Sequence, residues 1–217
     1  MRTAVQVAER AMVMGAVALR SSLEITDHPR SSEIMSGIPS WLEELGLTEA
    51  VDPLERAILL APPGQLDRDQ LADANWAGEG AAFFCWALGL GEQPPWLQQA
   101  DQQTVINALR VMRPEAGEHL RDPALRCVEE VQGFCKQVLL IRLEFLPEIA
   151  RPLKRKMLQR ELAGYGIEVE NVDVEEANRL VGSMTAEQRP PLYAPYLARD
   201  VAASWLLSSR SSYSDVD

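Results

Sequence analysis

The stretch NWAGEGAAFFCWALGLG, residues 75–91, decides how the fold is interpreted, because it is strongly apolar and still contains a carboxylate. Positions spaced by alternating steps of four and three residues run through and just before it, at Ala72, Trp76, Glu79, Phe83, Trp86 and Leu90, and all of them except Glu79 are apolar. This spacing is typical of one face of an α-helix. The sequence therefore predicts that Glu79 lies in the middle of a buried helical face.

A buried carboxylate without a partner costs several kcal/mol, so Glu79 must be protonated, paired with a cation or open to a cavity. Arginine suits such burial, because its planar fork can bind a carboxylate while its stem packs against apolar groups. The candidate partners are Arg10, Arg126, Arg142 and Arg199. We predict that Glu79 joins one or more of these arginines in a structural ion-pair network that fixes the register of the helices. The alternative is a cleft in which Glu79 is an acid, a base or a ligand-binding carboxylate.

Signals for helix starts are frequent along the chain. The motifs Asp52-Pro53-Leu54-Glu55 and Asp67-Arg68-Asp69-Gln70 both have the spacing of a capping box, and Asp122-Pro123 resembles another helix start. We expect helices at residues 3–24, 31–45, 53–60, 68–90, 102–112, 123–146, 151–163, 173–183 and 190–209.

Strand patterning is limited to residues 166–174, GIEVENVDV, and one strand cannot form a sheet. No flexible linker or internal repeat divides the chain. We therefore predict an all-α fold with about eight or nine helices in one compact domain, residues 1–217, and at most one short strand or hairpin near 166–174.

The composition suggests a cytoplasmic protein. The 217 residues are 47% hydrophobic and 24% charged, which is ordinary for a globular domain. The apolar runs are too short to span a bilayer, and no secretory signal is expected at the start of the chain. The three cysteines, Cys85, Cys127 and Cys135, lie in apolar sequence and are expected to be buried thiols in a reducing compartment.

The net charge of −11 argues against binding to nucleic acids or anionic membranes. Acidic residues dominate positions 40–101, whereas Arg151, Lys154, Arg155, Lys156 and Arg160 form a basic cluster. The acidic stretch is either a solvated surface or a surface for a basic partner. The candidate residues of that partner surface are Glu43, Glu44, Glu49, Asp52, Asp67, Asp69 and Asp73.

Motifs for catalysis are missing from the sequence. It contains no phosphate-binding loop, no nucleophile elbow and no zinc-protease motif. His28 and His119 are far apart, which argues against a histidine metal site. We expect no catalytic residue, no metal and no cofactor.

Four segments give the chain a resemblance to the bacterial domain-of-unknown-function family 4272. They are RTAVQVAERAMVM at 2–14, NWAGEGAAFFCWALGLG at 75–91, ALRCVEEV at 124–131, and YLARDVAASWLL at 196–207 with YSDVD at 213–217. The resemblance implies an α-helical domain with a signature core at Trp76, Trp86, Gly89 and Trp205. It implies no agreed activity, but members of the family are associated with immunity and toxin-related proteins.

These observations favour a non-enzymatic protein that acts by binding another protein. The partner would be a basic protein such as a toxin, in a toxin-immunity or secretion-system setting. The alternative is an enzyme or a small-ligand-binding protein built around Glu79. A homodimer with helices packed across a two-fold axis is a third interpretation.

Overall fold

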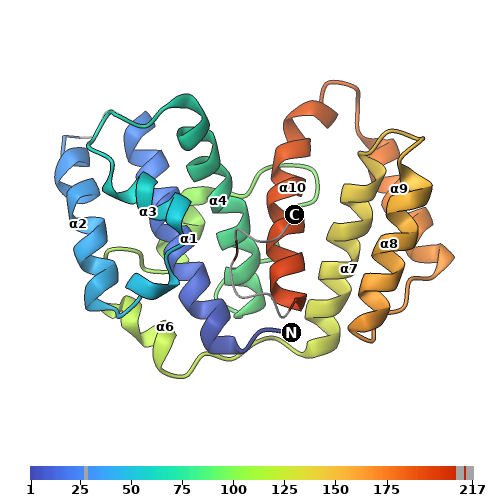
Figure 1. The fold of residues 1–217 in the computed structure, drawn as a ribbon, viewed down its shortest axis with the longest axis horizontal. Helices are drawn as coiled ribbons and strands as arrows, with labels where there is room; N and C mark the ends of the chain where they lie inside the picture. The colour runs from blue at the N-terminus through green and yellow to red at the C-terminus, as the bar shows by residue number, and fades with distance from the viewer. Residues whose placement is uncertain (27–28, 209–212, 214–217) are drawn as a thin grey trace.

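The computed structural model describes residues 1–26, 29–208 and 213, and this part of the chain is built from helices without strands. Figure 1 shows their arrangement. The ten α-helices are α1 (Ala4–Ile25), α2 (Ser31–Glu44), α3 (Pro53–Leu60), α4 (Arg68–Ala87), α5 (Gln102–Ala108), α6 (Glu118–Arg121), α7 (Val128–Glu144), α8 (Arg151–Gly164), α9 (Asn171–Ser183) and α10 (Arg189–Leu207). Two short 3-10 helices cover Thr48–Ala50 and Pro114–Gly117. The all-α prediction is confirmed, with ten helices instead of eight or nine.

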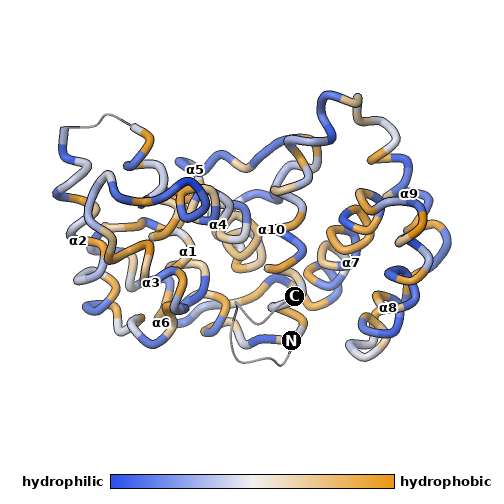
Figure 2. Tube along the Cα trace, turned by 45° about the horizontal axis from the view of Figure 1, so that its top comes forward, coloured by the Kyte–Doolittle hydropathy of each residue, from blue (hydrophilic) through white to orange (hydrophobic). Residues whose placement is uncertain are grey.

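The helices form two groups that meet at α10. In Figure 1, α1 to α6 lie on one side of α10, and α7, α8 and α9 lie on the other. Helix α4 packs most extensively against α1, and α10 contacts both α4 and α7. Figure 2 shows runs of hydrophobic positions on α4, α10 and α7 in the middle of the molecule. Because α10 is the last helix among the described residues, the core joins segments that are far apart in the sequence.

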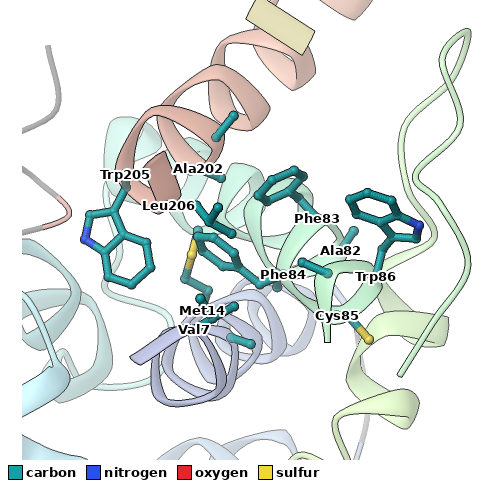
Figure 3. Close-up of a cluster of buried hydrophobic side chains, with 14 of the residues drawn as sticks. Val7, Met14, Ala82, Phe83, Phe84, Cys85, Trp86, Ala202, Trp205 and Leu206 are labelled. Atoms are coloured by element: carbon teal, nitrogen blue, oxygen red, sulfur yellow. The ribbon is translucent and has the colours of Figure 1, made fainter. Parts of the chain in front are cut away.

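Aromatic side chains of α4 fill the centre of this core. Phe83 and Phe84 are fully buried, and the rings of Phe84 and Trp205 meet edge to face with centroids 5.4 Å apart. Figure 3 shows Met14 of α1 and Leu206 of α10 packed against Phe84. The helix predicted from the 75–91 stretch is therefore the hub of the core.

Two helices, α5 and α7, differ most from their expected ranges. Helix α5 ends at Ala108, and Arg110 and Met112 both have positive φ angles, which a continuing helix does not allow. Helix α7 begins at Val128 and not at Pro123. The Arg126 N–H donates to the Ala87 carbonyl at 2.9 Å, so residues just before α7 cap the end of α4 and do not continue a helix.

The possible strand at 166–174 is not formed. Glu170 and Asp173 make a capping box that starts α9 at Asn171, so the second half of this stretch is helical. The expectation for the cysteines also needs one correction, because Cys127 is exposed where it precedes α7, whereas Cys85 and Cys135 are buried. Burial raises the pKa of Cys85 to about 11, which makes this thiol unreactive.

Within the part of the chain that the structure describes, none of the helices has the length and apolar character that a bilayer crossing requires.

Candidate functional site

Glu79 forms a buried ion pair with Arg199. The Arg199 Nε donates to Glu79 Oε2 at 2.9 Å, and its Nη2 lies 2.7 Å from the same oxygen. The other oxygen of Glu79 accepts a hydrogen bond from the Ala100 N–H at 2.8 Å. Glu79 is 3% exposed and Arg199 is 0% exposed. Both oxygens of the carboxylate are therefore occupied and sealed from solvent.

Arg199 also fixes the loop that follows α4. Its Nη1 donates to the Pro95 carbonyl at 2.7 Å, and its Nη2 donates to the Gln98 carbonyl at 3.1 Å. Tyr196, one turn earlier on α10, donates from its hydroxyl to the Trp96 carbonyl. Burial raises the pKa of Tyr196 to about 12, so this hydroxyl stays protonated and can donate. The ion pair thus joins α4, α10 and the loop between α4 and α5.

Arg199 is the one candidate arginine that reaches Glu79 within the described residues. Arg10 pairs with Glu55 and lies 3.7 Å from Asp52, and Arg126 pairs with Glu130 at 3.1 Å. Glu79 therefore pairs with one of its four candidate partners, and Arg10 and Arg126 pair with carboxylates of their own.

The fourth arginine, Arg142, lies between α7 and α10. Its Nε is 3.9 Å from Asp200 Oδ2, and its guanidinium lies over the Tyr193 ring at 5.1 Å. Burial raises the pKa of Asp200 to about 6, although the nearby Arg142 opposes this shift. Arg142 therefore belongs to a separate contact between α7 and α10.

The four signature residues take different positions. Trp86 and Trp205 are buried, at 3% and 5% exposure, and belong to the aromatic core. Trp76 is half-buried, and Gly89 is exposed. Gly89 has a φ of 70° just after α4 ends, where a residue without Cβ is favoured. Trp76 and Gly89 are therefore not core residues. Trp76 lines the groove described below, and Gly89 follows the end of α4.

The acidic residues of the candidate partner surface also divide. Asp52 contacts buried Arg10, and Asp67 caps α4 by accepting from the Gln70 N–H at 2.8 Å. Five of them are exposed on α2, on α4 or on the Thr48–Ala50 helix: Glu43, Glu44, Glu49, Asp69 and Asp73. Asp67, Asp69 and Asp73 therefore lie together at the start of α4, whereas Glu43 and Glu44 lie at the end of α2.

An apolar groove of about 470 Å³ lies between α1, α3, α4 and α10. Its apolar lining includes Leu54, Ile58, Trp76, Leu197 and Val201. Leu54 is 49% exposed and Leu197 is 38% exposed, so these side chains face solvent in the groove. The groove could not be predicted from the sequence, because it depends on how α10 lies against α3 and α4. The exposed leucines alone do not indicate it.

Carboxylates and a tyrosine border this groove. Asp52, Glu55, Asp73 and Tyr213 are also among the residues that line it. Asp52 and Glu55 are paired with Arg10, whereas no ion pair of Asp73 is present among the described residues. Partial burial and the neighbouring carboxylates Asp69 and Asp67 raise the pKa of Asp73. The groove thus combines apolar walls with an unneutralised negative charge.

Metal-ligating side chains do not gather into a group of three or more among residues 1–26, 29–208 and 213. His28 lies outside these residues, as do positions 214–217 of the YSDVD segment.

A comparison with protein-family models matches residues 1–141 to the family described as "Domain of unknown function (DUF4272)". The chain belongs to this family. The resemblance inferred from the sequence is confirmed, and the DUF4272 match ends within α7. Arg199 and the rest of α10 lie beyond the matched residues. No curated protein and no solved structure matches the chain.

Proposed function

We propose that this chain is a non-enzymatic, cytoplasmic protein that binds a partner polypeptide in the groove between α1, α3, α4 and α10. The observation that carries the proposal is the combination of exposed apolar walls with carboxylates in the lining of one groove. A groove between helices that is apolar and open to solvent is a common docking site for an amphipathic helix or an apolar peptide segment. The partner is expected to supply large apolar side chains.

The negative charge of the groove favours a partner that carries positive charge. Asp73 has no cation beside it in the described chain, and Asp69 and Asp67 add negative charge on the same helix end. A lysine or arginine of the partner would neutralise Asp73 and relieve this repulsion. A basic protein, such as a toxin held by its immunity protein, has the required chemistry.

The geometry gives less support to the alternative of an enzyme or a small-ligand-binding protein built around Glu79. A catalytic carboxylate must be within reach of a substrate. Glu79 is 3% exposed, its oxygens are bound by Arg199 and Ala100, and it is not among the residues that line the groove. We therefore propose a structural role for Glu79.

The test is a selection of random peptides displayed against the purified protein. We expect the enriched peptides to combine large apolar residues with lysine or arginine. Their affinity, measured by fluorescence anisotropy, should fall at least about tenfold in Leu197→Glu, because a loss of about 1.4 kcal/mol is enough for that change. Asp73→Asn should weaken binding less, and mainly at low salt.

The matched control is Val172→Glu on α9, which also replaces an exposed apolar side chain and lies outside the groove. This variant should bind the selected peptides as the unchanged protein does. Peptides that bind equally well to Leu197→Glu and to Val172→Glu would show that the groove is not the binding site.

A further inference from the structure

Helix α8 carries an apolar and basic face that is turned away from the rest of the molecule. The outward face of α8 is defined by Leu153, Lys156, Met157 and Arg160, and the exposed Ile149 lies in the turn just before the helix. Ile149 is 88% exposed, Leu153 is 71% exposed and Met157 is 65% exposed. Lys156 and Arg160 each follow one of the two α8 apolar residues by three positions, so they lie on the same side of the helix.

The opposite side of α8 holds the helix in the fold. Leu158 and Leu162 are buried, and Arg151 and Arg155 both reach Glu144 of α7, at 3.5 and 3.3 Å. The outward face takes no part in these contacts. Exposed apolar side chains that gather on one face are typical of an interaction surface.

The basic residues of this face are also available to a partner. Lys156 and Arg160 have no ion pair among the described residues, in contrast to Arg151 and Arg155 on the same helix. The outward face of α8 therefore offers the chemistry that the groove requires, namely large apolar side chains beside positive charge.

A single chain cannot bring these two surfaces together. Figures 1 and 2 show α8 at the outer edge of the molecule, beyond α7, whereas α3 and α4 lie on the other side of α10. The groove is formed by α1, α3, α4 and α10, so α7 and α10 separate it from α8. Contact between the two surfaces requires a second molecule.

We propose that the outward face of α8 of one copy binds in the groove of a second copy, so that the chain associates head to tail. In this contact Leu153 and Met157 meet the apolar wall of Leu54 and Leu197, and Lys156 or Arg160 meets Asp73. Two different surfaces are used, so each bound copy still has a free groove or a free α8, and the assembly can grow into a ring or a filament. This inference rests on the proposed function of the groove and names its occupant.

The test uses two double variants that each disable one surface. Leu153→Glu/Met157→Glu removes the apolar part of the α8 face, and Leu54→Glu/Leu197→Glu does the same in the groove. All four side chains are exposed, so both proteins should fold. Mass is followed by analytical ultracentrifugation in about 0.15 M salt, where screening over about 8 Å limits the repulsion between acidic molecules.

The unchanged protein should show a mass that rises above the 24.1 kDa of one chain as concentration increases. Each double variant alone should stay monomeric. An equimolar mixture should form a 1:1 dimer and nothing larger, because one variant retains the groove and the other retains α8. The control Leu60→Glu/Val172→Glu, with side chains exposed to similar degrees outside both surfaces, should associate as the unchanged protein does.

Three results would overturn the head-to-tail contact. One is an unchanged protein that stays monomeric throughout while it still binds the selected peptides, which leaves the proposed function standing. Another is a mixture of the two variants that does not recover the dimer. The third is binding of the unchanged protein to phosphatidylglycerol vesicles, lost in Leu153→Glu/Met157→Glu, without any self-association.

Discussion

At the scale of single residues, the pair of Glu79 and Arg199 ties three parts of the chain to one point. The Arg199 guanidinium donates hydrogen bonds to the Glu79 carboxylate and to the carbonyls of Pro95 and Gln98. The remaining Glu79 oxygen accepts a hydrogen bond from the N–H of Ala100. A buried pair of this kind does little for stability compared with an apolar replacement of both partners, but removing one partner leaves the other charge unpaired.

Glu79→Gln should therefore lower the free energy of unfolding by about 3–5 kcal/mol, because Arg199 loses its counter-charge in a site without solvent. Urea unfolding would measure the change. The matched control is Glu130→Gln, because Glu130 pairs with Arg126 at the surface, with side chains 45% and 32% exposed. It should cost less than about 1 kcal/mol. Equal effects in the two variants would contradict the structural role given to Glu79.

The residue scale also shows how far the sequence could predict the site. Glu79 could be identified as a buried carboxylate from helical spacing alone, and Arg199 was among four candidate partners. Choosing among the four requires distances, because each arginine lies in apolar sequence and each has an acidic side chain within reach in the fold. Arg10, for example, is occupied by Glu55, which lies 45 positions away in the sequence.

At the scale of elements, local signals predicted the helices that depend on local bonds. The capping boxes at Asp52 and Asp67 start α3 and α4 where expected. The predictions failed where tertiary contacts or a competing cap decided the structure. Residues before Val128 bond to the end of α4, and the cap at Glu170 converts an alternating stretch into the start of α9. Neither outcome follows from hydrophobic periodicity.

The packing of α1 against α4 depends on a glycine. A Cβ added to Gly80 would lie 2.3 Å from the Met14 Cε and 3.1 Å from the Tyr213 hydroxyl. Met14 is 3% exposed and packs against Phe84, as Figure 3 shows, so it has little room to move. A side chain at this position would therefore force the buried end of Met14 to move.

Gly80→Ala should destabilise the protein by about 1–3 kcal/mol through overpacking, even though alanine is the better helix former. Gly133→Ala is the control, because Gly133 is an exposed residue in the middle of α7, and an added Cβ would have nothing within 4 Å. It should stabilise the protein by about 0.5–1 kcal/mol. Thermal unfolding of the two variants would compare them, and two changes of the same sign would refute this explanation.

At the scale of the whole molecule, α10 joins the group of α1 to α6 to the group of α7 to α9. It contacts α4 through Arg199 and Glu79, and it faces α7, where Arg142 and Asp200 approach each other. The family match ends at residue 141, inside α7, yet the core of the matched region includes Trp205 and Leu206 of α10. The two groups of helices should therefore fold together as one domain.

This expectation can be tested because the tryptophans are unevenly placed. All five lie in α2, α4, α10 or the loop after α4, at Trp41, Trp76, Trp86, Trp96 and Trp205, and none lies in α7, α8 or α9. Tryptophan fluorescence therefore reports on the side of α1 to α6, on α10 and, because the rings of Trp86 and Trp96 pack against Phe134, on α7. Far-ultraviolet circular dichroism reports on every helix. If α10 couples the two groups, the unfolding curves in urea should coincide in midpoint and slope. A circular dichroism curve with a second transition that fluorescence does not detect would mean that α8 and α9 unfold as a separate unit.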